Sequence, residues 1–227
     1  MKMLALETSA DACSVALWLD DKIQARHEVL PMQQAQMILP MIEASLAEVD
    51  LRLADLDAIA FGSGPGSFTG VRIACSVAQG LAFGAKKPLI CVSSLAAAAQ
   101  TAFEELGATH VLVGMDARMQ EVYWGIYEAD AAGLMRLVGT EMVASARQVA
   151  RPKGEQWQGI GSAWDVYALD LIDHLGFAPK AVASDCLPTA TGVLRLAIEK
   201  FARQDFTPIE AAVPTYLRDD VAVKFKI

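Results

Sequence analysis

The same order of predicted elements occurs twice along the chain, and this repeat constrains the fold more than any other feature of the sequence. In the first half, apolar runs predict strands at 2–8, 12–19, 23–30, 56–61 and 89–92, and helical periodicity predicts helices at 33–49, 70–84 and 95–106. In the second half we expect strands at 110–115, 121–128, 134–143 and 157–160, and helices after Ser145, at 163–175 and at 189–204. Each half therefore begins with the order strand, strand, strand, helix, strand, helix.

A unit of this kind places an antiparallel hairpin beside parallel strands and covers the sheet with helices. The prediction is an α/β chain with a duplicated βββαβα fold in two lobes. This is the architecture of actin-like ATPases, sugar kinases and RNase H-like proteins. We assign residues 1–106 to the N-terminal lobe, which would carry a partner interface, and residues 107–227 to the C-terminal lobe. The tail, residues 207–227, is expected to pack back on the first lobe.

The charge and cysteine patterns exclude several functions. The net charge is −8 and the basic residues are scattered, so no basic face for direct tRNA binding is expected. The sequence contains no Cys-x-x-Cys pair, and the four cysteines lie in apolar segments as buried thiols. No apolar run reaches the about 18 residues of a membrane span, and the N-terminus lacks a secretion signal. A cytoplasmic protein without membrane contact is expected.

A glycine-rich segment, Gly62-Ser-Gly-Pro-Gly-Ser-Phe-Thr-Gly-Val-Arg72, joins a predicted strand to a predicted helix. Backbone N–H groups at such a position can hold an anion. The segment is neither a Walker A loop nor a dinucleotide fingerprint, because no Gly-Lys-Ser/Thr ends it and Ser67 replaces the third glycine. The alternative is a tight, closely packed turn in which Thr69 caps the helix.

Residues 64–72 of this segment resemble the signature of the TsaB (YeaZ) family of tRNA threonylcarbamoyladenosine biosynthesis subunits. Other segments of the family agree in order and spacing: Leu-Ala-Leu-Glu-Thr-Ser from Leu4, Cys-Ser-Val-Ala-Leu from Cys13, Ile-Leu-Pro from Ile38, Asp-Ala-Arg from Asp116, Glu-Val-Tyr from Glu121, and Pro214-x-Tyr216-x-Arg218. The resemblance covers essentially the whole chain. One departure is Gln34, where relatives often have histidine.

The resemblance implies a non-catalytic paralogue of TsaD, the subunit that holds a metal through a His-x-x-x-His pair. Ser94 and Ala98 stand at the positions of that pair. Alanine cannot bind a metal, and a serine hydroxyl is a poor ligand beside imidazole. The three histidines of the chain lie in different predicted elements and form no ligand pair. We therefore expect no catalytic residue, no metal site and no intrinsic enzyme activity.

The nucleotide elements of the actin-like fold are also degraded. Weak candidates for nucleotide contact lie at the ends of predicted strands and in the glycine-rich loop: Glu7, Ser9, Gly64, Gly66, Asp116, Gly159 and Gly161. The turn after Asp116 has no glycine for close approach to a phosphate. We expect no required cofactor, with ATP or ADP bound only at an interface within a complex.

Two predicted helices carry a second apolar face. In the first helix, Ile38, Ile42 and Leu46 share the inward stripe with Ala35, Leu39 and Val49, and a second stripe faces outward. The next helix has a smooth outward stripe of mostly small side chains, which allow close helix approach. The candidate interface residues are Met37, Met41, Ala44, Cys75, Ser76, Gln79 and Phe83. Burial of these faces inside the chain is the alternative.

The predicted function is a scaffold subunit that binds and activates a TsaD-type catalytic partner in forming threonylcarbamoyladenosine in tRNA. A TsaE-type ATPase is expected in a larger complex, and a homodimer when the partner is absent. An autonomous kinase or ATPase that uses Glu7, Asp116 and the glycine-rich loop is the alternative. A protease is disfavoured, because the sequence shows neither a Ser/His/Asp or Cys/His arrangement nor His-Glu-x-x-His.

Overall fold

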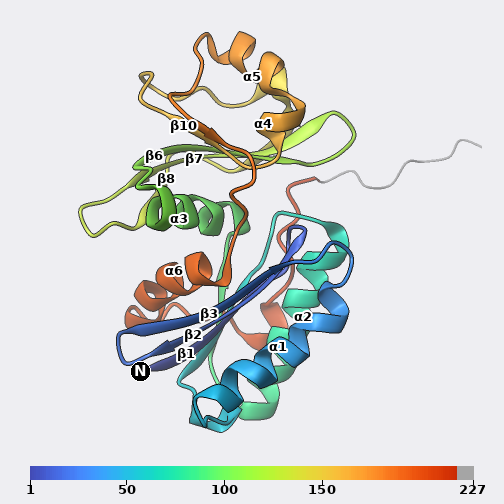
Figure 1. Cartoon of the computed structure of the whole chain (residues 1–227), viewed down its shortest axis with the longest axis vertical. Helices are drawn as coiled ribbons and strands as arrows, with labels where there is room; N and C mark the ends of the chain where they lie inside the picture. Colours follow the sequence, from blue (N-terminus) through green and yellow to red (C-terminus); the bar gives the residue numbers. More distant parts are fainter. Residues whose placement is uncertain (219–227) are drawn as a thin grey trace, which may run out of the picture.

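The computed structural model describes residues 1–218, which form two sheets stacked one above the other with helices on their faces (Figure 1). The first sheet has the strand order β3-β2-β1-β4-β5. Its strands are β1 (Lys2–Glu7), β2 (Ala12–Leu19), β3 (Lys22–Val29), β4 (Ala58–Gly62) and β5 (Leu89–Val92). β1 pairs antiparallel with β2 and parallel with β4. The first sheet thus has an antiparallel hairpin beside parallel strands, as expected from the sequence.

The second sheet repeats this order as β8-β7-β6-β10-β11, with β9 also pairing with β7. Its strands are β6 (His110–Asp116), β7 (Glu121–Ala129), β8 (Met135–Leu137), β9 (Met142–Ser145), β10 (Gln158–Ile160) and β11 (Val182–Ala183). β6 pairs antiparallel with β7 and parallel with β10, as β1 does with its neighbours. The duplicated, two-lobed actin-like α/β fold predicted from the sequence is confirmed.

Two elements expected to be continuous are divided. The strand expected at 134–143 is two short strands, because Gly139, at φ +85°, turns the chain between β8 and β9, and each strand pairs with a different part of β7. The helix expected at 163–175 is divided at Tyr167 into α4 (Ala163–Val166) and α5 (Ala168–Leu175). Ser145 precedes only a 3-10 turn at Ala146–Gln148, and its hydroxyl bonds the Gln148 side chain instead of capping the turn.

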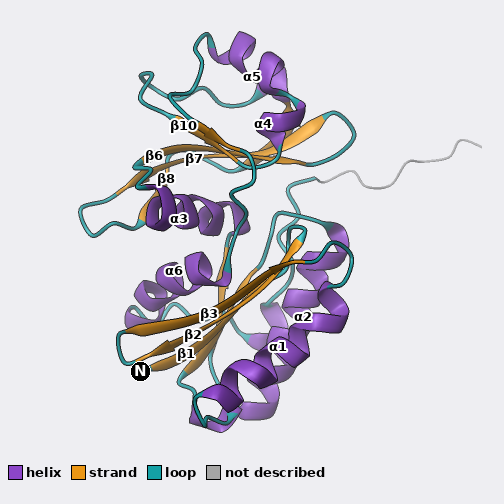
Figure 2. Cartoon of the chain, viewed as in Figure 1, coloured by secondary structure: helices purple, strands orange, loops and turns teal. Residues whose placement is uncertain are grey.

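Helices α1 (Gln34–Glu48) and α2 (Phe68–Ala85) cover one face of the first sheet (Figure 2). Side chains alternate between the two faces of β1, as the pleat requires. Leu4 and Leu6 pack in the core shared with α1 and α2, whereas Met3 and Ala5 pack in the core shared with α6 (Ala190–Ala202). The first sheet is therefore buried on both faces.

The helices between the two sheets are exchanged relative to chain order. α3 (Ser94–Leu106), which follows the first sheet in sequence, packs on β6 and β7 of the second sheet, and α4 and α5 cover its other face. α6, which follows the second sheet, covers the first. α3 and α6 pack closely on each other: a Cβ on Gly192 would lie 2.3 Å from the backbone oxygen of Ala97. Of the tail assigned to the second lobe, residues 219–227 lie outside the described part of the chain.

Candidate functional site

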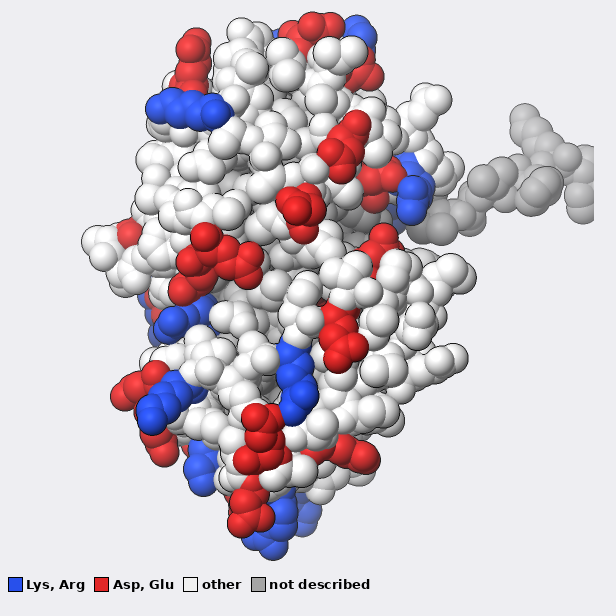
Figure 3. Space-filling view, viewed as in Figure 1, with Lys and Arg blue, Asp and Glu red and all other residues white. Residues whose placement is uncertain are grey.

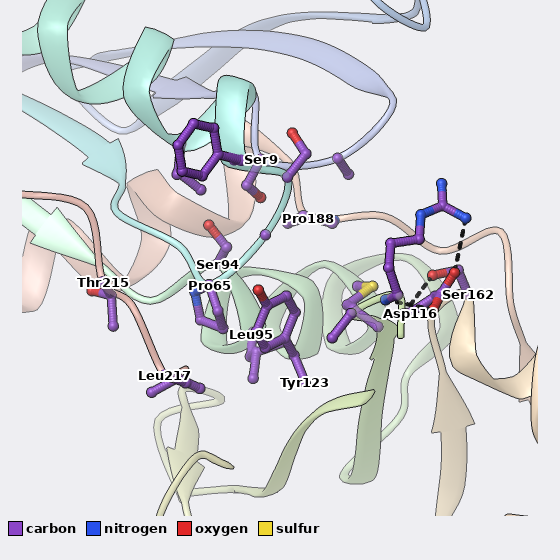
Figure 4. Close-up of a pocket in the computed structure, with 18 of the residues that line it drawn as sticks. Ser9, Pro65, Ser94, Leu95, Asp116, Tyr123, Ser162, Pro188, Thr215 and Leu217 are labelled. Atoms are coloured by element: carbon purple, nitrogen blue, oxygen red, sulfur yellow. Dashed lines mark hydrogen bonds and ion pairs between the residues drawn. The ribbon is translucent and has the colours of Figure 1, made fainter. Parts of the chain in front are cut away.

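A cleft of ≈ 960 Å³ lies between the lobes, where the loops at the ends of β1, β4 and β6 meet the segment after α6 (Figure 4). Ser9 lines it from the first lobe and Ser94 from the start of α3, which packs between the two sheets. Asp116 and Ser162 line it from the second lobe. Most of the remaining lining is apolar and includes Leu95, Met115, Tyr123, Leu187 and Leu217. A cleft between lobes is the place where an actin-like fold positions a ligand.

The glycine-rich loop at the mouth of this cleft is packed tightly against the turn after β1. The Ser67 Oγ accepts a hydrogen bond from the Gly70 N–H at 3.1 Å, so Ser67 caps α2 and the expected cap at Thr69 is wrong. A Cβ on Gly66 would lie 2.6 Å from the Ser9 backbone oxygen, and one on Gly70 would lie 2.0 Å from that of Thr8. The loop's glycines are thus required by contact between backbones, which is the close-packing alternative weighed from the sequence.

Glu7 lies beneath the cleft and is only 1% exposed. Its Oε1 accepts a hydrogen bond from the Ser9 N–H at 2.6 Å, and its Oε2 accepts one from the Ser94 hydroxyl at 2.8 Å. Burial raises the pKa of the Glu7 carboxyl, and these hydrogen bonds partly oppose the shift. Gly62 leaves the space for this side chain, because a Cβ there would lie 1.8 Å from Oε2. Glu7 joins β1, β4 and α3 instead of pointing into the cleft.

We expect Glu7 to make folding stability depend on pH. Since the folded-state pKa is raised, the protonated form is favoured on folding, and its contribution is complete below the unfolded pKa, near 4.5. That contribution is lost as the pH rises through the folded pKa. Glu7→Gln keeps the shape and stays neutral, so its stability relative to wild type should increase with pH. Urea unfolding from pH 4.5 to 8 measures this difference. Glu43→Gln, at an exposed position, serves as the control, and a parallel shift in both variants would contradict the assignment.

The candidates of the second lobe have mainly structural roles. Asp116 ends β6 and is paired with Arg118, whose guanidinium lies 3.0 Å from its carboxylate. Gly159 packs against the ring of Trp164, and Gly161, at φ +95°, lies against the backbone oxygen of Gly114.

In the first lobe, Gly64 donates its N–H to the Ser94 hydroxyl at 3.1 Å. Of the seven nucleotide candidates, Ser9, Gly66 and Asp116 line the cleft.

These residues do not fit a magnesium nucleotide held by this chain alone. Both carboxylate oxygens of Glu7 are engaged within the protein, and Asp116 already has a cationic partner. Within residues 1–218 no group of three or more His, Cys, Asp or Glu side chains is arranged to hold a metal ion.

The segment after α6 was not recognised as part of the site from the sequence, although Pro214, Tyr216 and Arg218 belong to a family motif. Residues 212–218, here called the strap, cross from the first lobe to the second. The Thr215 N–H donates to the Ser63 backbone oxygen at 2.7 Å. At the far end, the Arg218 guanidinium bonds the Ala117 backbone oxygen and the Glu121 carboxylate. A motif alone does not indicate where its residues lie.

The strap and the turn before it also cover part of the expected interface. The Gln79 side-chain amide donates to the backbone oxygens of Ile209 and Ala212, each at 2.9 Å, and the Cys75 thiol donates to that of Ala212 at 3.1 Å. Cys75 is 4% exposed. The expectation that Cys75 faces outward is wrong, and Gln79 is half-buried by the same segment. The chain itself covers this flank of α2.

Met41 is also misplaced by the sequence analysis, because it is buried in the core under α1. Ile38, Ile42 and Leu46 face the sheet as expected. The other buried residues of α1 are Gln34, Met41 and Ser45. Leu39, which was expected to face the sheet, is 47% exposed. Leu39 and Met41 are both apolar, and the more hydrophobic of the two, Leu39, is the exposed one, so hydropathy does not select the flank. The Gln34 side chain donates to the Ala10 backbone oxygen at 2.9 Å, which ties α1 to the turn after β1.

A groove of ≈ 380 Å³ runs between the exposed sides of α1 and α2. It is lined by Ala35, Phe68, Thr69, Arg72, Ile73, Ser76 and Val77. Of the expected interface residues, Ser76 lines this groove, while Ala44 and Phe83 are exposed and Met37 is half-buried. Phe68 and Phe83 are 63% and 74% exposed. Exposed aromatic rings beside small side chains are typical of a surface that another protein covers.

On the face shown in Figure 3, lysines and arginines are scattered among acidic side chains and form no continuous basic surface. A continuous surface of that kind is what binding to a nucleic-acid backbone requires. Among residues 1–218, no helix has both the length and the apolar composition needed to cross a membrane.

Comparison with known proteins finds relatives whose names agree with one another. Residues 28–224 match the family model described as TsaD: tRNA N6-adenosine threonylcarbamoyltransferase. The chain is 41% identical to the tRNA threonylcarbamoyladenosine biosynthesis protein TsaB of Escherichia coli, across 99% of this chain and 97% of that protein. It is 38% identical to the TsaB protein of Haemophilus influenzae, across 99% and 96% of the two chains.

Among solved structures, YeaZ from Pseudomonas aeruginosa superimposes with a TM-score of 0.89 at 44% sequence identity. The match covers 95% of this chain and 99% of that one. A second structure, described as an uncharacterized Pseudomonas aeruginosa protein with similarity to peptidase YEAZ, gives the same score and identity.

Proposed function

Because the chain belongs to the TsaB family of tRNA threonylcarbamoyladenosine biosynthesis proteins, we propose that it is a non-catalytic subunit that binds and activates a TsaD-type partner. The observation that carries this proposal is that the chain resembles TsaD proteins but lacks histidines at the metal-binding positions that the family resemblance implies. The chain matches the TsaD family model over residues 28–224. The family resemblance implies that Ser94 and Ala98 stand at the positions of the metal-binding histidines of TsaD, and neither side chain replaces an imidazole ligand. Ala98 is fully buried in the core around α3, and the Ser94 hydroxyl is engaged with Glu7.

The α1–α2 groove is the surface that suits a partner of related fold. Two helices with small and aromatic exposed side chains, meeting two helices of a similar lobe, would form a four-helix contact. A specific complex needs about 1,200–2,000 Å² of buried surface in total, which two helix pairs of this length can supply. A homodimer through the same face would form when the partner is absent, and a TsaE-type ATPase would join the larger complex.

We propose further that the chain requires no cofactor of its own and that ATP or ADP binds only where a partner supplies ligands. The engaged oxygens of Glu7 and the Asp116–Arg118 pair support this division. An autonomous ATPase remains the alternative, since the cleft lies where actin-like enzymes hold nucleotide. Magnesium-dependent ATP hydrolysis by the purified chain, lost in Glu7→Gln, would favour that alternative.

Reconstitution of the modification tests the proposed function. Transfer of the threonylcarbamoyl group from a supplied activated threonylcarbamoyl donor to adenosine in tRNA would be measured with the organism's TsaD-type and TsaE-type proteins, with and without this chain. We expect product only when the chain is present, and co-elution of the chain with the TsaD-type protein in gel filtration. Full product formation without the chain, or failure of the two proteins to associate, would contradict the proposal.

A further inference from the structure

The side chain of Arg72 connects the strap, residues 212–218, to the α1–α2 groove. The Arg72 guanidinium carbon lies 3.2 Å from the centre of the Phe68 ring and 5.0 Å from that of the Tyr216 ring. Its Nη1 also donates to the Phe68 backbone oxygen at 2.9 Å. Arg72 therefore links an aromatic ring of α2 to an aromatic ring of the strap.

Phe68 and Arg72 line both the α1–α2 groove and the cleft between the lobes. Tyr216 lines the cleft and belongs to the strap. A protein that covers the groove thus meets the Phe68–Arg72 side of the stack without needing to touch the Tyr216 side. The stack connects the two surfaces physically.

The strap in turn joins the lobes. Thr215 is bonded to Ser63 in the loop after β4, through both the Thr215 N–H and the pair of hydroxyls. Arg218 is bonded to the turn after β6, in which Arg118, Met119 and Gln120 all have positive φ. Three successive non-glycine residues in this conformation are held only by surrounding contacts. Arg218 supplies one of those contacts.

We propose that a partner seated on the α1–α2 groove tightens the strap through Arg72, so that partner binding is coupled to the link that the strap makes between the lobes. The inference rests on the proposed function, because it requires a protein partner on the groove. In the free chain Phe68 is 63% and Tyr216 48% exposed, so water weakens the stack. Covering the groove removes water from the Arg72 guanidinium, which faces both rings, and a desolvated cation–π contact is at least about twice as strong as an exposed one. The strap is held more firmly as a result.

Hydrogen exchange of strap peptides, with and without the TsaD-type partner, tests the coupling. We expect exchange at 212–218 to slow about fivefold on partner binding in the wild type, and to change little in Tyr216→Leu. Coupling is reciprocal, so Tyr216→Leu should also weaken the partner's affinity by about the same factor. Tyr216→Phe keeps the ring and should retain both effects. Tyr123→Leu, which removes a ring from the same cleft, is the matched control.

The outcomes separate the two proposals. Partner binding with unchanged exchange in the strap, or with equal slowing in wild type and Tyr216→Leu, would overturn the coupling and leave the proposed function intact. Failure of the wild-type chain to bind the partner at all would overturn the proposed function, and the coupling with it. Retention of strap slowing in Tyr216→Phe assigns the loss in Tyr216→Leu to the aromatic ring and not to the hydroxyl group.

Discussion

Ser76→Arg is expected to abolish stable association with the TsaD-type partner while leaving the fold intact. Ser76 is exposed on α2 and lines the α1–α2 groove. An arginine there fills the groove and introduces a charge that a covering protein must desolvate without a matched partner. Changes at the centre of an interface cost about 2–4 kcal/mol, which corresponds to a roughly 30- to 1,000-fold weaker Kd. Isothermal titration with the purified partner measures the change.

The folded state should tolerate this substitution. The new side chain lies four residues from Arg72, and like charges at that spacing cost about 0.2–0.5 kcal/mol on a helix. Thr140→Arg, at an exposed position of the second lobe, introduces the same side chain away from the groove and should bind the partner as the wild type does. Normal binding by Ser76→Arg would place the partner elsewhere. Met41→Asp is unsuitable for this test, because it would bury a carboxylate in the core of the first lobe.

The order of the elements was predictable from the sequence because each is signalled locally. The apolar runs at residues 2–8, at β4 and at β5 are short-range patterns, and their repetition identified the duplication. The exchange of α3 and α6 between the sheets was not predictable in this way. Their periodicity shows that each has a buried face, but not which sheet covers it. That choice depends on contacts such as Gly192 against Ala97, between residues far apart in the chain.

The candidate site was predictable to a similar extent. The glycine-rich loop was recognised because its four glycines lie within nine residues, and the structure accounts for Gly66 and Gly70 by their close approach to Ser9 and Thr8. The burial of Cys75 was not predictable, because the atoms that cover it belong to residues near Ala212. An outward apolar stripe on a helix indicates that something covers it. The stripe does not indicate whether that cover is the chain's own tail or another protein.

A pair of glycine substitutions in α2 should change stability in opposite directions. A Cβ on Gly70 would lie 2.0 Å from the Thr8 backbone oxygen and 2.5 Å from the Ser67 Oγ that caps the helix. The Thr8 backbone cannot move away without disturbing the turn after β1, and the Ser67 Oγ cannot move away without losing the helix cap. Gly70→Ala should therefore destabilise the fold by about 3 kcal/mol, the upper end for overpacking. For a chain of this size, the expected fall in Tm is roughly 6–12 °C.

Gly80 lies in the same helix, is exposed, and has no heavy atom within 4 Å of the position that a Cβ would take. Gly80→Ala should therefore stabilise the fold by about 0.5–1 kcal/mol, because alanine loses less backbone entropy in a helix. Urea unfolding of the two variants beside the wild type measures both changes. Since helix propensity does not disfavour alanine at either position, a loss at Gly70 measures the contact with the turn after β1. Equal stabilisation by both substitutions would show that this contact is absent in solution.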